Sequence, residues 1–227
     1  MSRPRYLFAH RGGRAHGPDN TLATFATALE RGATGLETDA WLTADGVVVL
    51  DHDGVHRAAD RRRTPLAQLR RSELPARIPS LDEVYAACGT GFDLAIDTRL
   101  PAVGAAVIEV AQRHGALDRL WLVTDKPDHL AEWRALSSEV HLAVSLRLVD
   151  RRASVIRRVV GSGAEAMNMR WPWWSRRLAA RVRDAGLLVF AYDAQSSYAL
   201  RRCMRLGTDG VFSDHVRRML AARGGAD

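Results

Sequence analysis

Short apolar runs alternate with longer segments of helical periodicity along almost the whole chain. Apolar runs of this length, bounded by Gly, Pro or polar residues, are typical of buried strands. The pattern predicts strands at 6–9, 35–41, 92–97, 120–124, 140–146, 166–169, 188–192 and 210–213. The segments with helical spacing that follow these strands are 21–31, 81–88, 102–114, 127–137, 151–160, 175–185, 197–206 and 214–222.

Turn and cap signals support these elements. Ser80 followed by Glu83 is a capping box at the start of the second helix. The Ala44-Asp45-Gly46 turn is a hairpin signal, and it predicts an added strand at 47–51 that folds back on the strand before it.

Eight strand–helix units in 227 residues, without a linker, predict a closed (β/α)8 TIM barrel formed by residues 1–227 as a single domain. Residues 53–79 fit neither element type, are rich in arginine and are expected to form a short excursion after the second strand. The alternative is a doubly wound open sheet. No Gly-x-Gly-x-x-Gly motif follows the first strand, which disfavours that alternative.

Composition and charge limit the function classes. Hydrophobic residues make up 47% and charged residues 26% of the chain, which excludes intrinsic disorder. The formal net charge is +7, and 32 of the 33 basic residues are arginine. Such an excess is typical of proteins that bind nucleic acid, an anionic membrane or a phosphate-bearing substrate, and equally of a solvated surface that prefers arginine.

The expected location is cytoplasmic. The two cysteines, Cys88 and Cys203, lie far apart without metal-ligand spacing and favour a reducing compartment. No apolar signal region follows the basic N-terminus, and no apolar run is long enough to span a membrane.

Polar side chains gather where the predicted strands end, which is where barrels of this type carry their chemistry. His10-Arg11-Gly12-Gly13 ends the first strand, and Glu37 and Asp39 share one face of the second. Arginine binds phosphate oxygens bidentately, and two inward carboxylates repel each other unless a cation neutralises them.

Two further strand ends add to this set. His52 lies between two aspartates, and a neighbouring carboxylate can orient an imidazole for proton transfer. Asp97 and Arg99 share a face at the end of the third strand. Three carboxylates form an all-oxygen ligand set, which suits one divalent cation such as Mg²⁺ or Ca²⁺ better than zinc.

The order and spacing of these motifs resemble the glycerophosphodiester phosphodiesterase family. The motifs that carry the resemblance are His10-Arg11-Gly12, Asp19-Asn20-Thr21, Glu37-Thr38-Asp39, Asp45-Gly46-Val47-Val48-Val49-Leu50-Asp51-His52-Asp53, Pro79-Ser80-Leu81-Asp82-Glu83 and Gly207-Thr208-Asp209-Gly210. The resemblance is dense over residues 6–99 and thinner to residue 214.

The resemblance implies a TIM barrel and assigns roles to single residues. Glu37, Asp39 and Asp97 resemble the metal ligands, and His10 and His52 resemble the general acid–base pair. Arg11 resembles a phosphate ligand, and Arg99 takes the place of a family lysine. The sequence also departs from the family pattern elsewhere: Asp19 and Asp97 replace glutamates, and Tyr192-Asp193-Ala194-Gln195 replaces Trp-Thr-Val-Asn.

The expected activity is the metal-dependent hydrolysis of a small-molecule glycerophosphodiester to sn-glycerol 3-phosphate and an alcohol. Alternatives are a phospholipase D-like lyase that forms a cyclic phosphate from lysophospholipids, and a non-catalytic barrel that binds phosphate esters. No nucleic-acid-binding motif is present, so no nucleic acid is expected as a partner. The Trp171-Pro172-Trp173-Trp174 segment either contacts lipid or covers the barrel as a packed loop. The oligomeric state is not predicted.

Overall fold

The computed structural model of the chain describes residues 4–57, 63–146 and 153–225. Eight parallel strands form a closed barrel, because β1 pairs with both β11 and β2. The strands are β1 (Tyr6–His10), β2 (Gly35–Leu42), β6 (Asp93–Asp97), β7 (Leu120–Thr124), β8 (His141–Leu146), β9 (Ala166–Arg170), β10 (Leu188–Tyr192) and β11 (Gly210–Ser213). The predicted closed (β/α)8 barrel is therefore confirmed.

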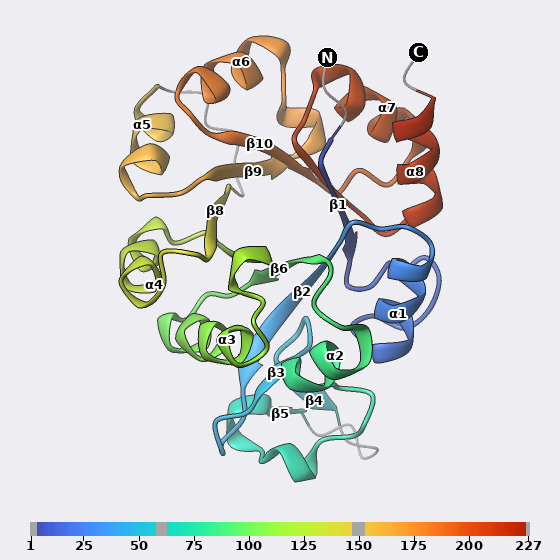
Figure 1. Cartoon of the computed structure of the whole chain (residues 1–227), viewed down its shortest axis with the longest axis vertical. Helices are drawn as coiled ribbons and strands as arrows, with labels where there is room; N and C mark the ends of the chain where they lie inside the picture. The colour runs from blue at the N-terminus through green and yellow to red at the C-terminus, as the bar shows by residue number, and fades with distance from the viewer. Residues whose placement is uncertain (1–3, 58–62, 147–152, 226–227) are drawn as a thin grey trace.

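An outer ring of α-helices covers the barrel (Figure 1). These helices are α1 (Leu22–Glu30), α2 (Leu81–Cys88), α3 (Pro101–Arg113), α4 (Leu130–Leu136), α5 (Ala153–Gly161), α6 (Arg176–Asp184), α7 (Ser197–Leu206) and α8 (Val216–Gly224). Short 3-10 turns, η3 (Leu117–Arg119) and η4 (Pro127–His129), precede β7 and α4. In the described residues, no helix has the length and apolar character needed to cross a bilayer.

Alternation along each strand separates two apolar layers. On β1, Leu7 and Ala9 belong to the cluster between the barrel and its helices, whereas Tyr6 and Phe8 belong to a cluster inside the barrel. The inner cluster is aromatic, and Phe8 stacks on Phe212 with ring centroids 4.5 Å apart. This packed interior fills the barrel below its carboxyl-terminal mouth. The polar side chains at the mouth therefore lie directly above a layer of apolar side chains.

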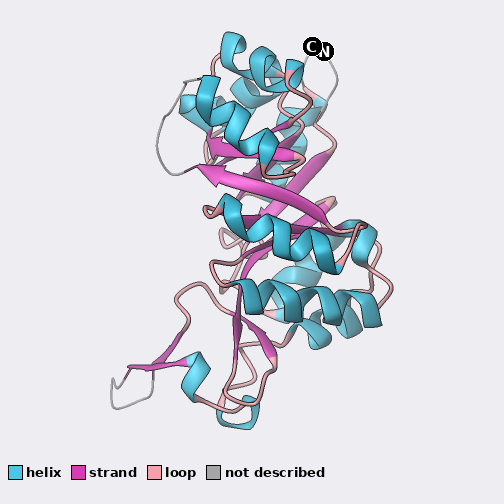
Figure 2. Cartoon of the chain, turned by 90° about the vertical axis from the view of Figure 1, so that its left-hand side faces the viewer, coloured by secondary structure: helices cyan, strands magenta, loops and turns pink. Residues whose placement is uncertain are grey.

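The expected excursion is present after β2. Strand β3 (Val48–Leu50) pairs antiparallel with β2, as the turn signal predicts, and is followed by a hairpin of β4 (Val55–Arg57) and β5 (Arg63–Pro65). Two 3-10 turns, η1 (Leu66–Gln68) and η2 (Arg71–Glu73), complete it. The side view shows this segment extending beyond the barrel (Figure 2).

The predicted element boundaries agree with the structure to within one or two residues in most cases. The predicted helix 127–137 is divided into η4 and α4, and the start of the predicted helix 151–160 lies outside the described residues. The predicted helix 214–222 is displaced, because α8 begins at Val216. Asp214 lies in the preceding turn, where its side chain binds His10.

Candidate active site

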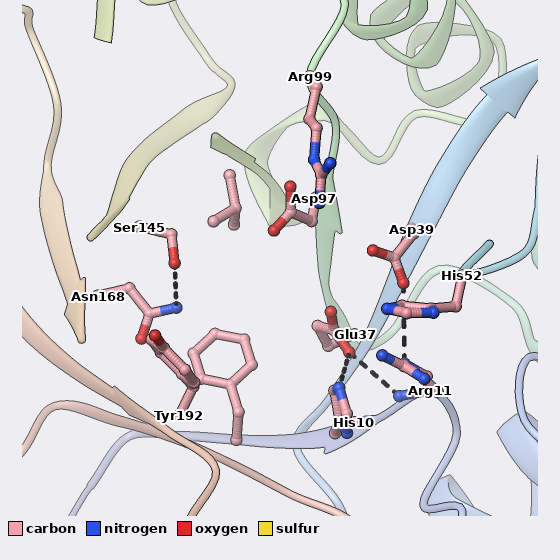
Figure 3. A pocket seen from close by; sticks show the side chains of 12 residues that line it. His10, Arg11, Glu37, Asp39, His52, Asp97, Arg99, Ser145, Asn168 and Tyr192 are labelled. Carbon is pink, nitrogen blue, oxygen red and sulfur yellow. Dashed lines mark hydrogen bonds and ion pairs between the residues drawn. The ribbon is translucent and has the colours of Figure 1, made fainter. Parts of the chain in front are cut away.

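A cavity of about 260 Å³ opens at the carboxyl ends of the barrel strands (Figure 3). All seven residues predicted from the sequence line it, together with five others. The lining residues are His10, Arg11, Glu37, Asp39, His52, Asp97, Arg99, Val123, Ser145, Asn168, Tyr192 and Phe212. The strand register explains this gathering, since His10 is the β1 partner of Glu37 and Asp39 is the β2 partner of Asp97.

Two carboxylates flank His10. Its Nδ1 lies 2.6 Å from Asp214 Oδ1, and its Nε2 lies 3.8 Å from Glu37 Oε2. Burial lowers the pKa of His10, but the charge of Glu37 and the hydrogen bond to Asp214 outweigh it, so that the pKa is raised. Burial raises the pKa of Asp214, but the hydrogen bond and charge of His10 outweigh it and hold the pKa below its usual range. Asp214 is therefore ionised near neutral pH and accepts a hydrogen bond from Nδ1–H, which leaves Nε2 to face the cavity.

The turn after β1 explains the His-Arg-Gly motif. Arg11, Gly12 and Gly13 all have left-handed backbone conformations, with φ of 50°, 78° and 79°. A Cβ atom at Gly12 would lie 2.8 Å from Thr24 Oγ1, so the close contact with α1 requires glycine. The turn directs the Arg11 backbone N–H to Glu37, where it donates to the main-chain oxygen at 2.8 Å and to Oε2 at 3.1 Å.

The Arg11 guanidinium lies between two carboxylates. Nη1 donates to Asp19 Oδ2 at 3.3 Å, and Nε lies 3.9 Å from Asp39 Oδ2 without a hydrogen bond. The side chain is only 13% exposed, so it presents a fixed positive charge at the cavity. Asp19 therefore still meets Arg11 although it is shorter than the family glutamate. The neighbouring Asn20 accepts a buried hydrogen bond of 2.9 Å from Thr38 Oγ1, which holds this loop on β2.

Glu37, Asp39 and Asp97 form an acidic cluster in the cavity. Burial and the carboxylates of Glu37 and Asp97 raise the pKa of Asp39 to about 9, despite Arg11 and Arg99. Asp39 Oδ2 is buried and has no hydrogen-bond partner. In the part of the chain that the structure describes, no three Asp, Glu, His or Cys side chains stand together as a ready-made metal site. The oxygen donors and the orphaned Asp39 oxygen nevertheless fit a hard divalent cation.

His52 lies on a bend after β3 and lines the same cavity as His10 and Asp39 (Figure 3). Asp51 Oδ1 fixes this bend by accepting hydrogen bonds from the backbone N–H groups of Asp53 and Gly54 at 2.8 and 2.9 Å. His52 Nδ1 lies 3.0 Å from Asp53 Oδ1, so the carboxylate that the sequence places beside it does contact the ring. The side chain is 46% exposed, much more than that of His10.

Sequence reasoning missed two polar residues of the site. Helical spacing places Asp214 in a helix, although its position directly after the last barrel strand is a signal for a site residue. Ser145 lies near the end of β8 and accepts a hydrogen bond of 3.4 Å from Asn168 Nδ2. Asn168 Oδ1 is buried without a partner, so this amide has an unused acceptor at the cavity.

A comparison with known protein families identifies the family of this chain. Residues 10–218 match the glycerophosphoryl diester phosphodiesterase family. The chain belongs to this family. As a member of it, the chain is an enzyme of the phosphoric diester hydrolase class.

Individual members of the glycerophosphoryl diester phosphodiesterase family match this chain over nearly its whole length. A glycerophosphodiester phosphodiesterase of Bacillus altitudinis is 23% identical, over 96% of this chain and 97% of its own. The crystal structure of a putative glycerophosphoryl diester phosphodiesterase from Silicibacter pomeroyi DSS-3 has a TM-score of 0.89 at 20% identity, covering 98% of this chain and 94% of that one.

A third relative was solved with a bound product. This phosphodiesterase of Oleispira antarctica, in complex with sn-glycerol-3-phosphate, has a TM-score of 0.87 at 21% identity and covers 98% of both chains. At these sequence identities, the solved structures establish that this chain has the same fold as they do.

Proposed function

We propose that this enzyme hydrolyses glycerophosphodiesters to sn-glycerol 3-phosphate and an alcohol. The observation that carries the proposal is a paired histidine, His10 with Asp214, in a cavity that also presents three carboxylates, two arginines and a second histidine. The product bound by the Oleispira antarctica relative supports the same substrate class.

Arg11 and Arg99 would bind the phosphodiester. Arg11 is held nearly buried at the cavity wall, and Arg99 follows β6 at the opposite side of the acidic cluster. Guanidinium groups bind phosphate oxygens through paired, charge-assisted hydrogen bonds. In these positions they would also stabilise the additional negative charge of the transition state.

Glu37, Asp39 and Asp97 would hold one divalent cation, Mg²⁺ or Ca²⁺. When bound, such a cation supplies Lewis-acid polarisation of the phosphoryl group and neutralises charge. Without added positive charge, the repulsion that raises the pKa of Asp39 would also oppose the approach of an anionic phosphodiester.

His10 would act as the general acid and His52 as the general base. The raised pKa of His10 favours its protonated form, and Asp214 leaves Nε2–H directed at the cavity. His52 would accept a proton from the nucleophile, which is water or a neighbouring hydroxyl group of the substrate, while His10 donates a proton to the leaving alcohol oxygen. The P–O bond to the nucleophile forms and the P–O bond to the alcohol breaks.

An assay of the purified protein on glycerophosphocholine and glycerophosphoethanolamine tests this function. We expect release of sn-glycerol 3-phosphate with Mg²⁺ or Ca²⁺ and its loss with EDTA. Absence of turnover with every divalent ion would overturn the proposal. Accumulation of a cyclic phosphate, detected by ³¹P NMR, would favour the lyase alternative.

We also propose that residues 1–227 form one domain and that the protein is cytoplasmic. Cys88 and Cys203 are both free thiols, which agrees with a reducing compartment.

A further inference from the structure

One part of the barrel wall is strongly basic. Residues 170–206, which include α6 and α7, contain eight arginines and two aspartates, a net charge of +6 out of the chain's +7. Such a concentration attracts anions to one face of the molecule.

A surface groove of about 370 Å³ lies between α6 and α7 within this segment. It is lined by Ser175, Arg176, Tyr198, Arg202, Arg205 and Leu206. Arg176 and Arg205 are exposed, and neither has an acidic partner among the described residues. Arg170, by contrast, is paired with Asp193 at 2.7 Å. The groove thus offers two guanidinium groups with open hydrogen-bonding capacity, and guanidinium groups recognise phosphate bidentately.

Arg202 builds the wall of the groove. It donates hydrogen bonds to the main-chain oxygens of Trp171 and Trp174 at 3.2 and 2.8 Å, and its guanidinium lies 5.4 Å from the centre of the Trp171 ring. Trp171, in the 3-10 turn η5 (Trp171–Trp173), contacts Tyr198 edge to face at 6.0 Å. Tyr198 is 60% exposed, an unusually open position for a large aromatic side chain.

The turn η5 beside the groove also contacts the active-site cavity. The turn η5 follows the carboxyl end of β9, and α7 follows that of β10, so both begin on the side of the barrel that carries the mouth. Trp173 contacts Tyr192 edge to face at 6.5 Å, and Tyr192 lines the active-site cavity. Trp174 is instead buried and donates to the Phe190 main-chain oxygen at 2.8 Å, so it anchors the turn rather than reaching outward.

We propose that this surface of Arg176, Arg205, Tyr198 and Trp171 docks the enzyme on an anionic phospholipid membrane. The two arginines would bind lipid phosphate groups, and the aromatic rings would lie at the headgroup level, where Trp and Tyr are favoured. The docked face lies on the barrel wall, and η5 connects it to the mouth. The proposal does not depend on which reaction the cavity performs.

Co-sedimentation with vesicles tests the proposal without turnover. Full-length protein is mixed with vesicles of phosphatidylcholine alone, or of phosphatidylcholine with phosphatidylglycerol, at increasing salt. The test variant is Arg176→Gln/Arg205→Gln. The matched control is Arg77→Gln/Arg217→Gln, which removes the same charge from exposed positions outside the groove. Hydrolysis of soluble glycerophosphocholine by the test variant should match the wild type.

We expect wild-type binding to require phosphatidylglycerol and to weaken with salt. The groove variant should lose about fivefold in affinity per arginine, roughly 25-fold for the pair, whereas the control loses much less. An equal loss of vesicle affinity in both variants would show that the attraction is diffuse, and it would overturn the proposed site. Absence of binding to anionic vesicles would also overturn it. Tighter, groove-dependent binding to duplex DNA would make this a nucleic-acid surface and overturn the membrane assignment.

Discussion

Asp214 Oδ1 lies 2.6 Å from His10 Nδ1, although 204 residues separate the two in the chain. The contact forms because β1 and β11 are neighbours in the closed barrel, and because the turn after β11 delays the start of α8 to Val216. The Asp214 backbone N–H donates to Gln195 Oε1 at 2.8 Å, which fixes this turn. Barrel closure thus supplies the carboxylate that sets the tautomer of the proposed general acid.

The first prediction concerns Asp214 as a positioning residue. Asp214→Asn removes the charge that helps to keep His10 protonated and the acceptor that fixes Nδ1–H. We expect kcat to fall by about 10²-fold or more, and the alkaline limb of the pH–rate profile to move to lower pH. Asp184→Asn, at an exposed position on α6, is the control. Unchanged kcat and an unmoved alkaline limb would remove Asp214 from the mechanism.

The second prediction separates the two histidines by their roles. His10→Ala and His52→Ala should each lower kcat on glycerophosphocholine by roughly 10²–10⁴ without unfolding the protein. A nitrophenyl ester of glycerol 3-phosphate carries a leaving group that needs no protonation. We therefore expect His10→Ala to recover most of its activity on that ester, and His52→Ala to recover none. Recovery by His52→Ala instead would reverse the assignment of acid and base.

The sequence predicts the acidic cluster because each of its residues can be recognised from its own position at a strand end. Glu37, Asp39 and Asp97 lie at strand ends with alternating spacing, and the parallel register of β2 and β6 then brings them to one cavity. Asp214 could not be found in this way, since helical periodicity extends through it and only barrel closure places it beside His10.

The excursion was recognised only as an interruption of the pattern. Its arginine-rich composition hides three buried residues, Leu66, Leu74 and Ile78, which pack with Val49 of β3. These residues are widely spaced in the chain, so no strand or helix period reveals them. Arg61 and Arg62, part of that composition, lie outside the described residues.

The third prediction concerns Asp39 and stability. The pKa of Asp39 is raised from 3.8 to about 9 on folding, so its ionisation makes the metal-free protein less stable as pH rises between these values. Asp39→Asn removes this ionisable group. In EDTA at pH 8, we expect the variant to melt about 2–6 °C higher than the wild type, the shift that roughly 1–2 kcal/mol produces in a chain of this size. The difference should shrink near pH 5, because keeping the carboxyl protonated in the folded state costs much less free energy there than at pH 8.

The same comparison tests cation binding. With millimolar Mg²⁺ or Ca²⁺ at pH 8, the wild type should gain stability and Asp39→Asn should gain little, because a ligand that binds only the folded state stabilises it. Differential scanning calorimetry measures both effects. Equal stabilisation of the two proteins by the cation would place its binding site elsewhere.

The fourth prediction concerns Arg99, which stands where the family pattern has lysine. Arg99 is exposed at the cavity, so its truncation leaves the fold intact. Loss of a hydrogen bond to a charged group costs about 1.5–3 kcal/mol, so Arg99→Ala should lower kcat/KM by roughly 10- to 100-fold. Arg99→Lys keeps the charge but not the bidentate fork, and we expect an intermediate value.

Inorganic phosphate provides an independent measurement for Arg99. As a competitive inhibitor it should bind Arg99→Ala more weakly than the wild type, again with Arg99→Lys between them, because the same charge holds phosphate and substrate. Arg113→Ala, whose side chain pairs with Asp82 on the outer wall, is the control and should leave the inhibition constant unchanged. If phosphate inhibits Arg99→Ala and the wild type equally, Arg99 does not contact the phosphoryl group, and Arg11 alone would carry that role.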